Sequence, residues 1–408
     1  MRIASALAGV AAVVLIGGGV TGSTGYGPSV PLLRGQVRPV AVTGAPSTAA
    51  YGAADTRFGL RLLAELDGTD RNIVFSPTSV ATSLGMAYLG ARGDTAAAMA
   101  RTLCLPATGD ANLAGLHDRT AALRAIPEVE TSDTAWLDLS LPTRPSYLDR
   151  IATGYDNGVR QVPLLSDPAG SADAINDTVS TETHGKIPRL VSADNLDRVG
   201  WVFTDAVYLK AAWQHPFGGE YPTENGPFHS PHGTVTADYL HTIASFRTAH
   251  VDGWIAVALP YQGGRLQMLA LLPDGTQTAP SPATLTALTR SLTPQMIDLR
   301  LPKVNITYTK ELSAPLTAMG MGIAFGSDAD FTGLSPAAGP IAFINHRATL
   351  TVDEQGTEAS AATATGNYAT SAVVAQTTIT FNHPYLMLIR DTPTTEPLLL
   401  SHITDPTG

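Results

Sequence analysis

Apolar positions follow a helical period in the first half of the chain and a strand period in the second half. Phe58, Leu62 and Leu66 recur at every fourth position, so they share one face of a helix. Asp94-Thr95 is a typical helix start. The pattern predicts helices over residues 56–66, 79–88, 94–103, 145–155 and 172–183.

The second half of the chain predicts short strands separated by turns. Gly263-Gly264 and Pro273-Asp274-Gly275 are turn signals between apolar runs. The expected strands are 201–209, 254–260, 266–272, 296–301, 348–352, 377–381 and 385–390. Runs of helix followed by runs of strand favour an α+β class over alternating parallel units.

The N-terminus has the features of an export signal. Arg2 precedes an apolar run over residues 6–20, and small residues follow, as a signal peptidase requires. The run is shorter than the roughly 20 residues of a membrane span. We expect a signal peptide over residues 1–25 and a secreted, extracellular protein. An uncleaved membrane anchor is the alternative. Residues 26–55, rich in Pro, Gly and Ser, are expected to be a flexible tether.

Composition indicates a globular protein with a large core. The chain has 408 residues, 44% of them hydrophobic and 15% charged, which argues against disorder. The net charge is −10, and lysine occurs only at 186, 210, 303 and 310. Nucleic-acid binding, which needs a basic face, is therefore excluded as an expected function.

The sequence predicts neither an enzyme nor a metal or cofactor site. It contains no Gly-x-Ser-x-Gly elbow, His-Glu-x-x-His pair or phosphate-binding glycine loop. His229, His232 and His241 are loosely clustered, without the carboxylate spacing of a known metal site. Cys104 is the single cysteine, so no disulfide within the chain is possible, and we expect it to be a small core residue.

Residues 351–381 form the most unusual segment. An acidic turn with Gly356 leads into small Ala, Ser and Thr residues, with no proline and, after Glu358, no charge. Such slim side chains could enter an existing sheet as an additional strand, which is a known recognition mode. A flexible alanine-rich linker is the alternative interpretation.

Several motifs, in order, resemble the serpin family of serine protease inhibitors. The segment 351–365 resembles the serpin reactive-loop hinge. Further similar motifs are Asn72-Ile73-Val74-Phe75-Ser76-Pro77, Leu89-Gly90-Ala91-Arg92-Gly93-Asp94, Ile175-Asn176-Asp177, Gly185-Lys186-Ile187, Asp205-Ala206-Val207-Tyr208-Leu209-Lys210, Leu259-Pro260-Tyr261, Leu301-Pro302-Lys303 and Phe381-Asn382-His383-Pro384-Tyr385. The similarity extends from about residue 56 to about 406.

The resemblance implies a fold and a mechanism. We expect a single serpin domain over residues 56–406, with a large mixed sheet, additional sheets, N-terminal helices and an exposed reactive loop at 354–376. An exported, bacterial-type serpin would be a monomer without a cofactor. It would act as a suicide substrate, and its partner would be a serine protease trapped in a covalent complex as the cleaved loop inserts into the sheet.

The hinge agrees with this mechanism when it is placed on a strand. Thr357, Ala359, Ala361 and Thr363 would face one side of the sheet, and all are small and uncharged. Fifteen inserted residues would move an attached protease about 50 Å. The expected hinge residues are Glu354, Gly356, Thr357, Glu358, Ala359, Ser360, Ala361, Ala362 and Thr363.

The family's spacing places the reactive bond between Thr370 and Ser371, whereas counting back from Phe381 gives a site nearer Val373. The window 368–374 contains no basic residue, which disfavours a trypsin-like target. Its small apolar residues favour an elastase- or subtilisin-like protease. Cleavage after Tyr368 would suit a chymotrypsin-like one.

By resemblance, two clusters control the opening of the sheet. Ser76, Ser79, Asp205 and His346 would form the family's buried shutter, with Asp205 in place of the usual asparagine. Trp213, Lys303 and Glu354 would form the breach, where the loop enters. The family's polyanion-binding helix would lie within 105–130, where only Arg119 and Arg124 are basic. We interpret both as solvated charges and expect no heparin-like partner.

The main alternative is a non-inhibitory serpin that serves as a carrier, chaperone or binding protein. Such relatives often have bulky, charged or proline residues in the hinge, whereas this hinge has none after Glu358.

Overall fold

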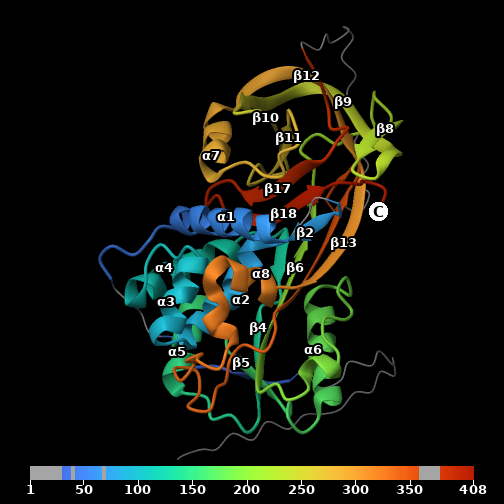
Figure 1. Ribbon diagram of the computed structural model, residues 1–408. Helices are drawn as coiled ribbons and strands as arrows, with labels where there is room; N and C mark the ends of the chain where they lie inside the picture. The colour runs from blue at the N-terminus through green and yellow to red at the C-terminus, as the bar shows by residue number, and fades with distance from the viewer. Residues whose placement is uncertain (1–29, 38–41, 67–69, 358–376) are drawn as a thin grey trace, which may run out of the picture.

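The computed structural model describes residues 30–37, 42–66, 70–357 and 377–408 (Figure 1). Its helices are α1 (Thr48–Glu65), α2 (Pro77–Gly90), α3 (Gly93–Thr102), α4 (Gly109–Arg124), α5 (Pro145–Tyr155), α6 (Pro168–Glu182), α7 (Pro282–Ser291) and the short α8 (Ser313–Leu316). Its strands are β1 (Leu32–Leu33), β2 (Ile73–Phe75), β3 (Val129–Thr131), β4 (Thr134–Asp138), β5 (Val159–Val162), β6 (Trp201–Leu209), β7 (Ala211–Ala212), β8 (Glu224–Ser230), β9 (Gly233–Val251), β10 (Trp254–Pro260), β11 (Leu266–Pro273), β12 (Thr293–Pro302), β13 (Val304–Glu311), β14 (Asn345–Val352), β15 (Gly356–Thr357), β16 (Thr377–Thr380), β17 (Tyr385–Asp391) and β18 (Pro397–Ile403).

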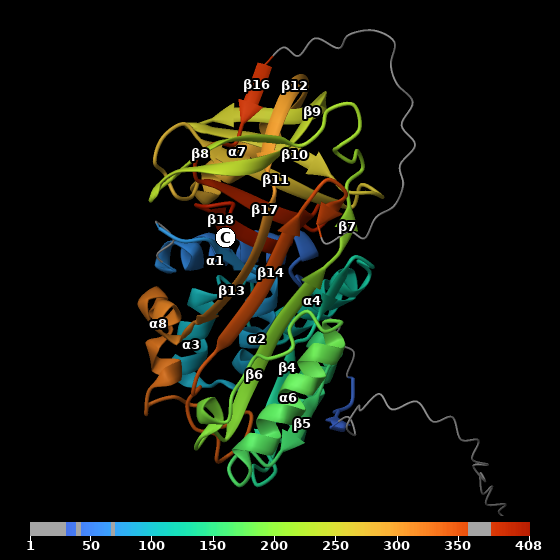
Figure 2. The ribbon, with the colours of Figure 1, turned by 90° about the vertical axis from the view of Figure 1, so that its right-hand side faces the viewer.

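One sheet, here called the long sheet, follows the long axis of the molecule (Figure 2). Its strand order is β1-β5-β4-β6-β14-β15-β7, with β13 paired to β14 and β3 paired to β6. Strands β6 and β14 pair in parallel only at Asp205–Ala206 and His346–Arg347. Farther along, β15 pairs with both β14 and β7. The hinge therefore already occupies one end of the sheet.

The second sheet, here called the upper sheet, has the order β16-β12-β9-β10-β11-β17-β18-β2, with β8 paired to β9. Figure 2 shows β16 and β12 at the top of the molecule, far from β5 at the other end. Because β15 and β16 flank residues 358–376, each sheet holds one end of the segment expected to be the reactive loop.

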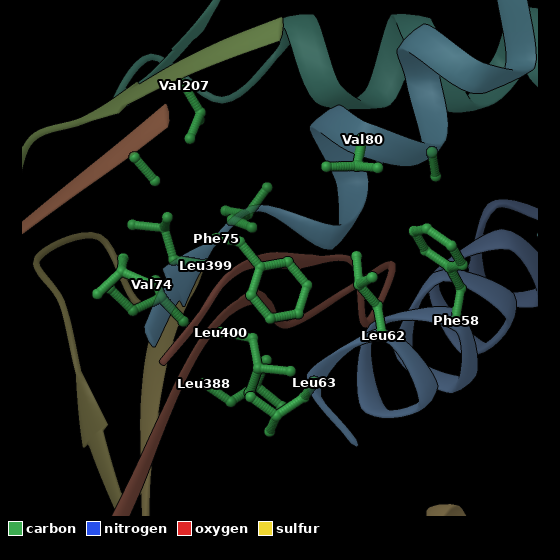
Figure 3. Close-up of a cluster of buried hydrophobic side chains, with 14 of the residues drawn as sticks. Phe58, Leu62, Leu63, Val74, Phe75, Val80, Val207, Leu388, Leu399 and Leu400 are labelled. Atoms are coloured by element: carbon green, nitrogen blue, oxygen red, sulfur yellow. The ribbon is translucent and has the colours of Figure 1, made fainter. Parts of the chain in front are cut away.

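A buried apolar cluster joins the helices to both sheets (Figure 3). Its side chains come from α1, β2, α2, β6, β17 and β18, and include Phe58, Leu62, Phe75, Val207 and Leu400, all at most 5% exposed. Each such side chain contributes about 1.5–3 kcal/mol when fully buried. In Figure 1, α2 to α5 lie on one side of the long sheet and α6 on the other. Their arrangement confirms the expected α+β class.

Most predicted elements are present, and some have the predicted bounds. Helix 145–155 and strands 201–209 and 254–260 begin and end where the pattern placed them. The helix predicted from residue 56 instead begins at Thr48, where Ser47 Oγ accepts a hydrogen bond from Ala50 N at 3.3 Å. The alanines that follow favour helix without an apolar period, so the pattern did not reveal this start.

The expected tether over residues 26–55 is wrong for two of its parts. Residues 48–55 are helical, and Leu32–Leu33 pair with Val159 and Arg160 as an edge strand. Arg160 also donates to the carbonyl of Val30, and Asp149 Oδ1 accepts from Gln36 N at 2.8 Å. These contacts attach residues 30–36 to the rest of the protein, whereas the composition of this segment predicted a flexible tether. The expected signal, residues 1–25, lies outside the described residues.

Two further features correct or limit the sequence predictions. Cys104 is only half-buried, at a positive φ of 54° just after α3, so it is not a core residue. Among the described residues, no helix combines the length and the apolar character needed to cross a bilayer.

Candidate functional site

The hinge residues Gly356 and Thr357 lie between β14 and β7. Gly356 pairs with Ala212 and Thr357 with Ala211. A Cβ on Gly356 would overlap the carbonyl oxygen of Ala211 and lie 2.8 Å from Ala212 Cα, so only glycine fits here. Thr357 is 1% exposed and its hydroxyl shares a 2.6 Å hydrogen bond with the hydroxyl of Tyr261. The side chain of Thr357 thus points inward.

Glu354 and Lys303 form an ion pair next to the hinge. Lys303 Nζ lies 3.0 Å from both carboxylate oxygens of Glu354, and the Thr223 hydroxyl donates to Oε1 at 2.6 Å. Burial alone would raise the pKa of Glu354, but the hydrogen bond from Thr223 and the contact with Lys303 lower it below its ordinary value. The carboxylate is therefore held in its charged form where β14 turns into β15.

Trp213 packs beneath this turn. It is 1% exposed and stacks on Tyr261 with ring centroids 4.5 Å apart. Its indole N–H donates to the Asp353 carbonyl at 2.9 Å, and its backbone N–H donates to the Gln355 carbonyl at 2.8 Å. The three residues expected at the breach thus lie together around the first residues of the hinge.

The residues expected at the shutter lie where β6 and β14 meet, below the hinge. Ser76 N donates to His346 Nε2 at 3.2 Å, and Ser79 N donates to Ser76 Oγ at 3.1 Å as the cap of α2. His346 is opposite Asp205 in the β14–β6 pairing. An accepting Nε2 means that the imidazole is neutral in this arrangement. Its role as a gate stays a prediction.

One shutter contact was missed. The hydroxyl of Ser79 donates to Asp133 Oδ1 at 2.8 Å. Asp133 precedes β4, and no motif drew attention to it. Only the folded structure, which places Asp133 beside Ser79 at the N-terminus of α2, reveals this contact.

Several predicted residues cannot be placed. Glu358, Ala359, Ser360, Ala361, Ala362 and Thr363 of the hinge, and Thr370 and Ser371 of the reactive bond, lie outside the described residues. Within the ranges that the structure does describe, no group of three or more His, Cys, Asp or Glu side chains is arranged to hold a metal ion.

The comparisons with known proteins identify the family. The family model described as "Serpin (serine protease inhibitor)" matches residues 53–406. The chain belongs to the serpin family.

Similar proteins come from distant organisms. A serpin-like protein of Thermococcus kodakarensis is 32% identical over 86% of this chain and 84% of its own length. The leukocyte elastase inhibitor of Sus scrofa is 30% identical over 87% of this chain and 99% of its own length. Among solved structures, the thermophilic serpin tengpin in its native state aligns with a TM-score of 0.81 at 21% identity, covering 92% of this chain and all of tengpin. Uncleaved ovalbumin aligns with a TM-score of 0.76 at 22% identity, covering 87% of this chain and 100% of its own. These two structures establish the serpin fold.

The interpretation of Arg119 as a solvated charge is wrong. This residue of α4 is 3% exposed, and its guanidinium contacts two buried carboxylates, Asp55 of α1 and Glu396 before β18. Burial, together with the neighbouring charge of Asp55 and against the opposing effect of Arg119, raises the pKa of Glu396 to about 8. Arg119 therefore joins three distant segments of this serpin inside the core. Arg124, in contrast, is about half exposed and pairs with Asp156.

Proposed function

We propose that this serpin inhibits a serine protease by the suicide-substrate mechanism and is not itself an enzyme. The observation that carries the proposal is the placement of Gly356 and Thr357 between β14 and β7. A strand that has begun to enter the sheet needs only to extend to insert further. The small residues that follow it in the sequence suit that extension.

The chemistry would take place on the protease. Its serine oxygen attacks the carbonyl of Thr370, the Thr370–Ser371 peptide bond breaks, and Ser371 leaves as the new N-terminus. The ester then links the protease to a loop whose first part is free to insert. Insertion by about fifteen residues carries the ester about 50 Å along the sheet and distorts the protease before water completes hydrolysis.

The absence of a basic residue between 368 and 374 supports an elastase- or subtilisin-like target, or a chymotrypsin-like one if cleavage follows Tyr368. We further propose that the protein is secreted, because its N-terminal segment has the features of an export signal. We also propose that it acts as a monomer without a cofactor. That the leukocyte elastase inhibitor of Sus scrofa is a relative agrees with this choice of target.

The test is incubation with elastase-, subtilisin-, chymotrypsin- and trypsin-like proteases, followed by denaturing gels and the mass of the released peptide. We expect an SDS-resistant adduct with at least one of the first three and none with the trypsin-like enzyme. The peptide mass distinguishes Thr370–Ser371 from a bond nearer Val373. Clean cleavage by every protease, with no adduct and no gain in heat resistance, would instead favour a carrier or chaperone.

A matched pair of variants tests the insertion step. Ala361→Arg places a charge on the face that must be buried, whereas Ala362→Arg places the same charge on the opposite face. Both loops stay cleavable. We expect Ala361→Arg to be turned over as a substrate without adduct, and Ala362→Arg to retain most of the adduct. Equal loss in both variants would contradict an inserted strand.

A further inference from the structure

A four-membered charge cluster lies on the upper sheet, apart from the shutter and the breach. His241 of β9 is 7% exposed, and its Nε2 lies 3.0 Å from Asp298 Oδ1 of β12. Its Nδ1 lies 3.1 Å from Glu224 Oε1 of β8, without the alignment of a hydrogen bond. Arg300 of β12 contacts the same two carboxylates, at 3.3 Å from Glu224 and 3.0 Å from Asp298. The carboxylates of Glu224 and Asp298 thus each contact both the imidazole of His241 and the guanidinium of Arg300.

The charge of this cluster depends on one proton. A neutral imidazole has a single N–H, yet both ring nitrogens of His241 face carboxylate oxygens. With the ring protonated, two cations balance two anions. With the ring neutral, the cluster has a net charge of −1 and one carboxylate faces a nitrogen lone pair. The ring centroid of Tyr221 lies 5.0 Å from that of the imidazole, and the charged groups of the cluster around it are Glu224, Asp298 and Arg300.

The cluster lies close in sequence to the residues that bind Glu354 at the hinge, and one of its strands, β12, pairs with β16 at the other end of the expected reactive loop. On the hinge side, Glu224 follows Thr223, whose hydroxyl binds Glu354. Lys303, the other partner of Glu354, follows directly after β12. On the far side of the loop, Arg300 is paired with Thr380 of β16, and its carbonyl accepts from Phe381 N at 2.9 Å. Figure 2 shows β8, β9, β12 and β16 together at the top of the molecule.

Release of β16 matters for an uncleaved loop. Insertion between β6 and β14 carries the chain away from β16, toward the opposite end of the long sheet (Figure 2). Because β16 is paired with β12, we expect an intact loop to insert fully only after β16 separates from β12. The ion pairs of the cluster connect β12 to β9 and to Glu224 at the start of β8. By stabilising this arrangement, they would oppose insertion of the uncleaved loop.

We infer that His241 is a positioning residue. When protonated it stabilises β16 and the hinge contacts of Glu354, the two ends of the reactive loop, and when neutral it stabilises them less. Histidine is the side chain that changes charge between about pH 5 and 8. The inference deepens the proposed function, on which its consequence for inhibition rests. As the pH rises through this range, β16 and the hinge become more mobile and the intact inhibitor loses activity faster.

Amide hydrogen exchange of the full chain, without any protease, tests the coupling. Phe381 N reports on β16 and Trp213 N on the hinge, because each donates a single backbone bond across the site. We expect the protection factors of both, corrected for intrinsic exchange, to be lower at pH 8 than at pH 5.5. His241→Gln should abolish this dependence, and Asp298→Asn, which keeps the side-chain shape, should reduce it.

His250 supplies the matched control. It lies on the same strand β9 and pairs with Asp274 at 2.7 Å, but its side chain is 60% exposed. His250→Gln should retain the pH response of the wild type. A response that is flat in the wild type, or that persists in His241→Gln, overturns the inference. Absence of a protease adduct alongside an intact exchange response would reject the proposed function and leave the coupling supported.

Discussion

Two glutamates of this serpin have pKa values displaced in opposite directions. Thr223 and Lys303 hold Glu354 charged at the hinge, whereas burial beside Asp55 keeps a proton on Glu396 in the core. The first group contributes stability above its ordinary pKa and loses it in acid. The second contributes stability in acid and loses it as the pH rises from about 4.5 to about 8.

At Glu354, we predict that Glu354→Lys opens the sheet. The variant places a second cation against Lys303 and removes the acceptor of the Thr223 hydroxyl. Because the pair is about one-third exposed, the expected cost lies between about 1 kcal/mol for an exposed pair and about 3–5 kcal/mol for a buried one. Loop-sheet polymers should appear on native gels and by light scattering. The control is Glu220→Lys, at an exposed position nearby. A monomeric, fully inhibitory Glu354→Lys would contradict the prediction.

At Glu396, we predict that stability falls as the pH rises from the ordinary glutamate pKa of about 4.5 to about 8. The folded state holds a proton in this range that the unfolded state has released, so unfolding becomes easier as the pH rises. Glu396→Gln keeps the shape without the charge, so its denaturation midpoint relative to wild type should rise between pH 5 and 9. Parallel curves for the two proteins would show that Glu396 does not titrate there.

The same buried cluster marks the limit of sequence reasoning at this scale. Arg119 looked like any helical arginine because its partners lie 64 and 277 positions away, and no local pattern connects them. Glu354 and Lys303 were found only because the family motif relates them. Thr223 and Asp133, which complete the hinge and shutter contacts, carry no signal of their own.

At the scale of elements, the hinge strand β15 depends on one glycine. We predict that Gly356→Ala expels β15, because the new Cβ would overlap the Ala211 carbonyl. The loop should then be cleaved as a substrate more often than it traps the protease, which the ratio of cleaved inhibitor to adduct measures. Gly219→Ala is the control, since a Cβ there would meet no atom within 4 Å. An unchanged ratio in Gly356→Ala would mean that β15 is not required for insertion.

Elements with local start and stop signals were predicted best. Helix α5 has Pro145 in its first turn, which is a start signal visible in the sequence, and it ends at Tyr155, before Asp156 with its left-handed φ of 46°. Strand β9 extends over Gly233–Val251 and was not predicted, because Ala, Thr and His residues there alternate without strong apolar contrast. Its identity depends on pairing with β12, β10 and β8, which only the tertiary structure supplies.

At the scale of the whole molecule, the intact fold is expected to be kinetically trapped, with a more stable form reached by loop insertion. We predict that cleavage within residues 368–374 raises the melting temperature by more than about 10 °C, because the inserted strand completes the pairing between β6 and β14. Differential scanning calorimetry of intact and nicked protein measures this. Nicked Ala361→Arg should gain much less. A nicked wild type that melts with the intact protein would show that the loop stays outside the sheet.

The edge strand β1 determines which end of the molecule would face solution if the protein were attached to a surface through its N-terminus. It is fastened to β5, at the end of the body remote from β16 (Figure 2). A fusion partner, bead or bilayer attached ahead of Leu32 would therefore hold the molecule at the end near β5 and leave the end that carries β16 free. Immobilisation by this terminus should cost little capture of proteases arriving from solution.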